Sequence, residues 1–205
     1  MQELLRDVEA YFEDKIKTHG ATHYGVDFTT PSAQTTRFEQ LVKVVDGDTA
    51  FSINDYGSGY GALVEFLATR WTDFAYCGFD ISKAMRTVGE SLYASDTRIR
   101  FTGDYGELDV ADYTVASGIF NIKLDCDSDT WERYVIEEVG RMAAVSKKGF
   151  AFNMLTSYSD PEHMRDDLYY GDPLLYFDHC KRNFSRNVAL LHDYNGFDFT
   201  IIVRL

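Results

Sequence analysis

From Phe51 onward, short apolar runs alternate with stretches whose apolar residues recur at helical spacing. This alternation is typical of a mostly parallel sheet with helices on both faces. Seven runs have the character of strands, and they lie at 50–54, 75–79, 99–102, 113–117, 149–153, 188–192 and 197–203. The sequence therefore predicts an α/β fold with a seven-stranded, mostly parallel, doubly wound sheet.

The last two predicted strands are joined only by Asp193-Tyr194-Asn195-Gly196. Asn-Gly is a strong signal for a tight turn. A parallel pair would need a crossover of about a dozen residues or more. We therefore expect the sheet to end in an antiparallel C-terminal hairpin.

Two helices are predicted before the first strand. The first carries Leu5, Val8, Phe12 and Ile16 at helical spacing and ends at Gly20. The second begins at Thr30-Pro31, because proline is favoured in the first turn of a helix. We expect residues 1–48 to form an N-terminal helical lid and residues 49–205 to form one Rossmann-like unit.

Composition and charge exclude several classes of protein. The 205 residues suffice for one domain, and the net charge of −13 repels the phosphates of nucleic acids. No apolar run approaches the roughly 18 residues that span a bilayer, and the N-terminus is unlike a signal peptide. We therefore expect a cytoplasmic protein with no nucleic-acid or membrane partner. No sequence feature indicates an oligomeric state.

The sequence gives no indication of a metal site. The three cysteines are widely spaced and contain no CxxC, which argues against a zinc site or a disulfide framework. Asp125, Asp127 and Asp129 precede a predicted helix, where acidic residues suit the helix dipole. We expect no bound metal.

The segment Asp55 to Gly61 is the first candidate for chemistry. It directly follows an apolar strand and opens a helix, which is the context that gives a glycine loop its meaning. Glycines let the backbone approach a ligand closely, and the amides that follow suit an anionic group. Gly57, Gly59 and Ala62 also satisfy the dinucleotide pattern G-x-G-x-x-G/A, so the loop alone leaves NAD open as a ligand.

Asp80 ends the next strand, where an acidic side chain can accept hydrogen bonds from two ribose hydroxyls. This position supports an adenosine-type ligand without choosing between NAD and S-adenosylmethionine. Capping of the following helix is the alternative role for this aspartate.

Four motifs in order resemble those of the class I S-adenosylmethionine-dependent methyltransferases. They are Asp55-x-Gly57-x-Gly59-x-Gly61, Asp80-Ile81-Ser82-x-x-Met85, Gly103-Asp104 and Ser117-Gly118-Ile119-Phe120-Asn121. The resemblance covers roughly residues 51–205 and includes the final hairpin, which NAD-binding Rossmann domains do not share.

The resemblance implies S-adenosylmethionine as cofactor and methyl transfer as activity. The acid of the second motif would hold the ribose, and the third motif would lie at the adenine. The fourth would close over the methionine part and the reacting methyl group. The implied cofactor-binding residues are Asp55, Gly57, Ser58, Gly59, Gly61, Asp80, Ile81, Ser82, Met85, Gly103, Asp104, Tyr105, Ser117, Gly118 and Ile119.

The acceptor is expected to be a small molecule methylated on oxygen or nitrogen. The Asn/Asp-Pro-Pro-aromatic signature that the family uses for amino groups of bases or glutamine is absent from 117–121. Arg37 in the predicted lid is a candidate for holding the methionine carboxylate, and loop aromatic residues are candidates for an acceptor pocket. The candidate acceptor-site residues are Tyr24, Arg37, Phe38, Asn121, Asn153, Tyr158, Tyr169 and Tyr170.

A methyl sulfonium is already activated, so the transfer has no obligatory catalytic residue. For a hydroxyl acceptor, a His, Asp or perturbed Tyr within hydrogen-bond reach would serve as general base. His163 is the candidate, because it follows the fifth predicted strand at the edge where open α/β sheets bind ligands. An NAD-dependent oxidoreductase and a noncatalytic relative of the family remain as alternatives.

Overall fold

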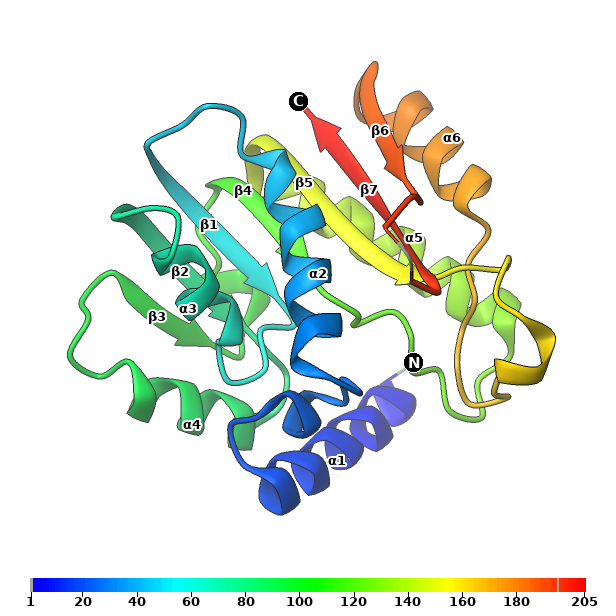
Figure 1. The fold of residues 1–205 in the computed structure, drawn as a ribbon, viewed down its shortest axis with the longest axis horizontal. Helices are drawn as coiled ribbons and strands as arrows, with labels where there is room; N and C mark the ends of the chain where they lie inside the picture. Colours follow the sequence, from blue (N-terminus) through cyan, green and yellow to red (C-terminus); the bar gives the residue numbers. More distant parts are fainter. Residues whose placement is uncertain (1, 195) are drawn as a thin grey trace.

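The computed structural model describes residues 2–194 and 196–205. Its single sheet contains β1 (Ala50–Tyr56), β2 (Asp73–Phe79), β3 (Ile99–Thr102), β4 (Ala111–Ala116), β5 (Ser146–Leu155), β6 (Asn187–Leu191) and β7 (Asp198–Arg204). The strands lie in the order β3-β2-β1-β4-β5-β7-β6 (Figure 1). The predicted fold class is confirmed, and the strand order reverses between β1 and β4, where ligands of such sheets bind.

The expected antiparallel hairpin at the C-terminal end of the sheet is confirmed, and β7 is the strand that runs against its neighbours. β7 lies between β5 and β6 and runs antiparallel to both, whereas every other pair of neighbours is parallel. Asn195, in the predicted tight turn, lies outside the described residues. The insertion of β7 places its first residue, Asp198, opposite Leu155 at the carboxyl end of β5.

In the part of the chain that the structure describes, six α-helices surround the sheet. They are α1 (Gln2–His19), α2 (Pro31–Leu41), α3 (Ala62–Ala68), α4 (Lys83–Leu92), α5 (Ser128–Ala144) and α6 (Pro173–Asn183). The two predicted N-terminal helices are present, with Gly20 left-handed after α1 and Thr30 capping α2. Apolar spacing did not predict α6, which begins where the Asp172 side chain caps the helix ahead of Pro173.

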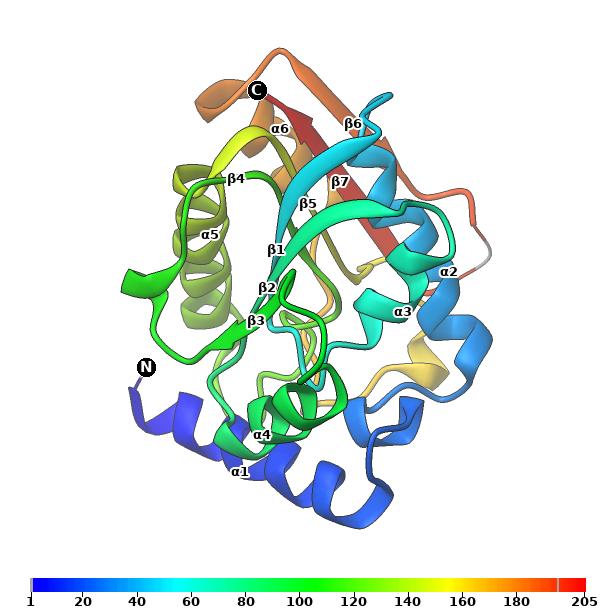
Figure 2. The same cartoon turned by 90° about the vertical axis from the view of Figure 1, so that its left-hand side faces the viewer.

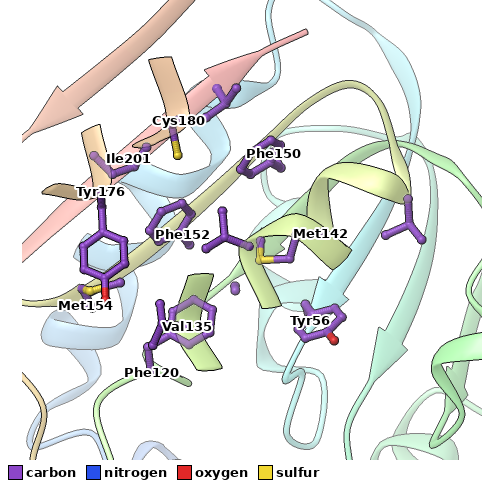
Figure 3. Packing of buried hydrophobic residues seen from close by; sticks show 14 of the residues in the cluster. Tyr56, Phe120, Val135, Met142, Phe150, Phe152, Met154, Tyr176, Cys180 and Ile201 are labelled. Atoms are coloured by element: carbon purple, nitrogen blue, oxygen red, sulfur yellow. The ribbon is translucent and has the colours of Figure 1, made fainter. Parts of the chain in front are cut away.

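Two hydrophobic cores lie on opposite faces of the sheet (Figure 2). On one face, Ile53, Val115 and Ala151 pack beneath α2 and α3. On the other face, Phe150 and Phe152 of β5 point toward α5 and α6, as Figure 3 shows. Because successive side chains of a strand alternate between faces, each central strand supplies both cores.

The two helices before β1 take different positions. α1 crosses beyond the carboxyl ends of the parallel strands, as Figures 1 and 2 show, whereas α2 packs against β5 and β7. Tyr11 Oη and Lys15 Nζ of α1 donate hydrogen bonds of 2.8 and 2.5 Å to the Asp27 carboxylate, which tie α1 to the link that follows it.

No helix among the described residues is long and apolar enough to cross a membrane.

Candidate functional site

A cavity of about 360 Å³ lies at the carboxyl edge of the sheet. Its wall is formed by α1, residues 26–29, α2, the loop after β1, the end of β2, the loop after β4 and α5. The cavity thus lies at the reversal between β1 and β4, covered by α1.

The glycine loop forms the floor of this cavity. Gly57 and Gly59 have φ values of 81° and 55°, a region that favours glycine. A Cβ on Gly57 would lie 2.1 Å from Ile119 Cγ2, and one on Gly59 would lie 2.8 Å from Val26 Cγ1. Glycine at these positions therefore lets the loop after β4 and the N-terminal segment close onto the β1 loop.

Asp80 links the glycine loop to α4. One carboxylate oxygen accepts a 2.7 Å hydrogen bond from the Gly59 amide and the other accepts a 2.8 Å bond from the Ser82 amide. Burial raises the pKa of the Asp80 carboxyl, and these two amides act against that rise. Ser82, whose hydroxyl accepts from the Met85 amide, is the residue that caps α4. Asp80 thus lies at the cavity with free lone pairs on both oxygens.

Asp55 is a second acid at the cavity wall and is almost fully buried. Its carboxyl accepts a 2.8 Å hydrogen bond from Tyr76 Oη. Burial raises the pKa of Asp55 to about 7, although the Tyr76 hydrogen bond favours the charged form. Among the described residues, neither Asp55 nor Asp80 forms an ion pair. The acids of the cavity wall therefore favour a ligand that carries positive charge.

Most of the cofactor candidates come together in the cavity wall. Those in the wall are Asp55, Gly57, Ser58, Gly59, Asp80, Ile81, Met85, Ser117, Gly118 and Ile119. The structure places the remaining candidates just outside it. Gly61 packs under Phe101, and Ser82 caps α4.

The third motif lies on the surface beside the cavity. Gly103 and Asp104 are exposed, and the Asp104 carboxylate accepts from the Gly106 amide to cap a short 3-10 helix. Tyr105 packs edge to face against Tyr56 and Phe79, which are wall residues. This motif thus reaches the cavity through an aromatic contact rather than through its acid.

The loop after β4 is held by two asparagines. Asn153 Oδ1 accepts a 2.7 Å hydrogen bond from the Gly118 amide, and Asn121 Oδ1 accepts a 3.0 Å bond from the Leu155 amide. Gly118 is left-handed, with φ 73°. Asn121 lies in the cavity wall, and Asn153 is not among the wall residues but bonds the residue that follows Ser117.

Arg37 and Phe38 of α2 also lie in the wall. The Arg37 guanidinium lies over the ring of Phe28, 5.0 Å from its centroid, and pairs with Asp198 at 2.5 Å. This guanidinium is therefore already bound to a carboxylate within the protein.

The other acceptor candidates lie outside the wall. Tyr24 is exposed beside His23, and Tyr158 is exposed beside His192. Tyr169 is buried in the core, where its hydroxyl bonds that of Tyr176. The remaining candidate, Tyr170, accepts a hydrogen bond from the Arg165 amide.

His163, the candidate base, is exposed on a short 3-10 helix (Pro161–His163) and packs against Phe197. It is not among the residues that line the cavity.

Two parts of the wall were missed by the motifs. Leu5, Val8 and Phe12 supply the apolar face of α1, and the helical stripe that contains them was the available signal. The second missed part comes from α5, where nothing in the sequence distinguished wall residues from core residues. It consists of Trp131, Tyr134, Glu138 and Arg141. Glu138 is buried and accepts a 2.5 Å hydrogen bond from Tyr56 Oη.

Comparisons with known proteins agree with this geometry. The chain is 44% identical over 163 residues to "Putative methyltransferase Rv1506c" of Mycobacterium tuberculosis, and the match covers 80% of this chain and 98% of the relative. No family model matches the sequence.

Solved structures that contain S-adenosylhomocysteine (SAH) share the fold. Magnesium protoporphyrin IX methyltransferase from Synechocystis, with bound SAH, has a TM-score of 0.68 at 13% identity, over 97% of this chain and 98% of that one. The DhpI–SAH complex has a TM-score of 0.66 at 13% identity, over 100% and 98%. Phosphoethanolamine N-methyltransferase 1 from Haemonchus contortus has a TM-score of 0.66 at 15% identity, over 100% of this chain and 50% of that one.

Proposed function

The chain belongs to the class I S-adenosylmethionine-dependent methyltransferases, and we propose that it methylates a small molecule on oxygen or nitrogen. The relative and the structural neighbours with bound SAH or SAM favour S-adenosylmethionine over NAD as the cofactor, and an enzyme over a noncatalytic relative.

The observation that carries the proposal is the partial cover that α1 and the loops form over the cavity. Loops and helices cover it, and its volume of about 360 Å³ suits ligands of small-molecule size. Two structural neighbours are named for small compounds, magnesium protoporphyrin IX and phosphoethanolamine. The net charge of −13 supports the further expectation that nucleic acid is not the acceptor.

The residues of the wall fit the cofactor. Glycines 57 and 59 let Ile119 and Val26 pack directly onto the β1 loop, whose backbone forms the floor of the cavity. Asp80 has lone pairs available for ribose hydroxyls, and Ile81 and Met85 offer apolar surface for the adenine side. The unpaired carboxylate of Asp80 suits the positive charge of a sulfonium or an ammonium group, whereas the carboxyl of Asp55 retains its proton below about pH 7, because burial raises its pKa to about 7.

The remaining cofactor assignments are proposals of the same kind. Ser58, Ser117, Gly118 and Ile119 would contact the methionine part from the two loops that meet at Gly57. The candidates outside the wall would support the cofactor site from positions next to it. They are Gly61, Ser82, Gly103, Asp104 and Tyr105.

The cofactor supplies a methyl group that is already activated for displacement. The chain contributes alignment and exclusion of water, which together account for several kcal/mol of a typical barrier. Phe38, Ile119 and Ile122 bring apolar side chains to the wall, and Asn121 holds the β4 loop against β5. Residues 1–48 would act as the lid of this site, and we expect the protein to work in the cytoplasm.

The test is transfer of a labelled methyl group from S-adenosylmethionine to a panel of small hydroxyl and amine compounds, with tRNA and a protein mixture as comparison acceptors. Product with a small compound would support the proposal. Label that enters only RNA or protein would overturn it.

A further inference from the structure

Buried polar atoms without a hydrogen-bond partner gather at one place. Among the described residues, five buried side-chain nitrogen or oxygen atoms have no partner, and four of them belong to Arg37, Ser117, Asn153 and Asp198. We call these four residues the polar cluster. Buried polar groups are normally paired, so such a concentration needs a physical reason.

The strand register places three members of the cluster on one face of the sheet. Ala116 of β4 pairs with Phe152 of β5, so Ser117 and Asn153 both lie one residue beyond that pair. Asn153 pairs with Thr200 of β7, and Asp198 lies two residues from Thr200 on the same face. The face is the one that α2 covers, and α2 carries Arg37.

The existing hydrogen bonds determine which atoms remain free. Arg37 donates from Nη1 to Ala33 O and from Nη2 to Asp198 Oδ2, so its Nε–H is unused. Asn153 accepts from Gly118 through Oδ1, so its Nδ2 donors are unused. The hydroxyl of Thr200, which lies on the same face of the sheet, already has a hydrogen-bond partner in the hydroxyl of Tyr194.

The free atoms are of both kinds. Arg37 Nε and Asn153 Nδ2 are donors, Asp198 Oδ1 is an acceptor, and Ser117 Oγ can act as either. Asn153 is fully buried and Asp198 is 3% exposed, while Arg37 and Ser117 lie in the cavity wall. A group that complements the cluster must therefore both accept and donate hydrogen bonds.

The charges of the cavity wall disfavour an anionic group, and an ammonium group has no lone pair with which to accept from Arg37 or Asn153. Each arginine of the wall is paired with an acid: Arg37 with Asp198, Arg141 with Glu138 and Arg165 with Asp167.

The wall acids Asp55 and Asp80, by contrast, form no ion pair among the described residues. An anionic acceptor would meet uncompensated acids and no free cation.

We propose that the polar cluster is the hydrogen-bonding subsite for a neutral, hydroxyl-bearing methyl acceptor. A hydroxyl can accept from Arg37 or Asn153 while it donates to Asp198 or Ser117, which no carboxylate can do. Water would satisfy the same atoms before the acceptor binds. This inference rests on the proposed function and gives it a substrate class.

The test uses two sets of ring-matched probes with labelled S-adenosylmethionine. The neutral members are methyl glucoside and phenol, the carboxylates are glucuronate and benzoate, and the amines are glucosamine and aniline. Ser117→Ala removes only an unpaired hydroxyl. Asn153→Asp retains the Oδ1 acceptor for Gly118 but replaces the unused donor with an oxygen.

Ser146→Ala is the matched control. Its hydroxyl is also buried, and it bonds Thr114 and Met142 at the opposite end of β5. Titration with S-adenosylhomocysteine measures the cofactor site separately in every variant. The side-chain amide NMR signal of Asn153, identified by its loss in Asn153→Asp, reports probe binding without turnover.

We expect methyl transfer to a neutral hydroxyl probe, with kcat/KM about tenfold lower in Ser117→Ala and in Asn153→Asp. The Kd of S-adenosylhomocysteine should stay within about twofold in Asn153→Asp, which is not assigned a cofactor contact, and a neutral probe should shift the Asn153 signal. Preference for a carboxylate or an amine, unchanged kcat/KM in both variants, or silence of all probes while S-adenosylhomocysteine binds would overturn the inference. Failure of S-adenosylhomocysteine to bind the unaltered protein would instead count against the proposed function.

Discussion

The carboxylate of Asp80 accepts a hydrogen bond from the backbone amide of Gly59 at 2.7 Å. This contact joins the carboxyl end of β2 to the tip of the loop after β1, across 21 residues of sequence. The two motifs that resemble a cofactor site are therefore one unit before any ligand binds. Because the contact leaves lone pairs on both carboxylate oxygens, it orients Asp80 without using up its capacity to accept.

Substitution Gly57→Ala should destabilise the fold and weaken cofactor binding. The backbone at φ 81° is costly for alanine, and the new Cβ would lie 2.1 Å from Ile119 Cγ2. We expect a loss of at least about 2 kcal/mol in the free energy of unfolding and S-adenosylhomocysteine binding more than about tenfold weaker. Urea unfolding and calorimetric titration measure both.

Gly140→Ala is the control for this substitution. Gly140 lies within α5, and a Cβ there would meet nothing within 4 Å. Alanine should stabilise the protein by about 0.5–1 kcal/mol, because it lowers the conformational entropy of the unfolded chain and has a higher helix propensity than glycine. Equal behaviour of the two glycine variants would show that the loop is not closely packed.

The pH dependence of stability should contain a contribution from Asp55. Its pKa is raised from 3.8 to about 7 by burial, so the folded protein holds a proton that the unfolded chain has released. The stability that this proton provides is complete below pH 4 and is lost as the pH rises through 7. We therefore expect Asp55→Asn to gain stability relative to the unaltered protein between pH 5 and pH 8. The gain is at most about 4 kcal/mol, which corresponds to roughly three pKa units.

Urea unfolding at several pH values between 5 and 8 provides the measurement. Asn can still accept the Tyr76 hydrogen bond, so the comparison isolates the titrating group. A difference in stability that does not change with pH would mean that Asp55 is ionised throughout this range.

The contacts of Asp27 should control how fast the cofactor leaves. Asp27 receives hydrogen bonds from Tyr11 and Lys15 and has a φ of 61°, a conformation that asparagine also tolerates. Asp27→Asn should therefore weaken the attachment of α1 with little loss of stability, since the ion pair is partly exposed. We expect S-adenosylhomocysteine to dissociate about two- to fivefold faster, as followed by stopped-flow fluorescence.

Glu13→Gln removes a different ion pair of α1, the exposed one between Lys17 and Glu13. It should leave the dissociation rate unchanged. If both variants dissociate at the same rate as the unaltered protein, α1 does not act as the lid.

The sheet could be predicted from the sequence because its signals are local. β3 begins and ends where the apolar run does, while β5 extends past its predicted ends from Ser146 to Leu155. Strand pairing decides such ends, and apolar pattern does not. α6 escaped prediction because its buried residues, Tyr176 and Cys180, give only a short stripe.

The cofactor side of the site was predictable to a similar degree. Gly57, Asp80 and Ser117 each follow a parallel strand, and parallel strands bring their carboxyl ends to one edge. The acceptor side of the site was not predictable, because it depends on whether each aromatic side chain points into the core or into the cavity. Tyr169 turns into the core to meet Tyr176, whereas Phe38 reaches the wall, and composition does not separate the two.

The most direct test of the cofactor site is calorimetric titration of the unaltered protein and Asp80→Asn with S-adenosylhomocysteine and NAD, with the exposed Asp109→Asn as a control outside the cavity wall. We predict one S-adenosylhomocysteine per chain, binding about tenfold to a hundredfold weaker in Asp80→Asn, unchanged binding in Asp109→Asn and no binding of NAD. Equal affinity of the unaltered protein and Asp80→Asn for S-adenosylhomocysteine, or binding of NAD in its place, would contradict the assignment of this cavity.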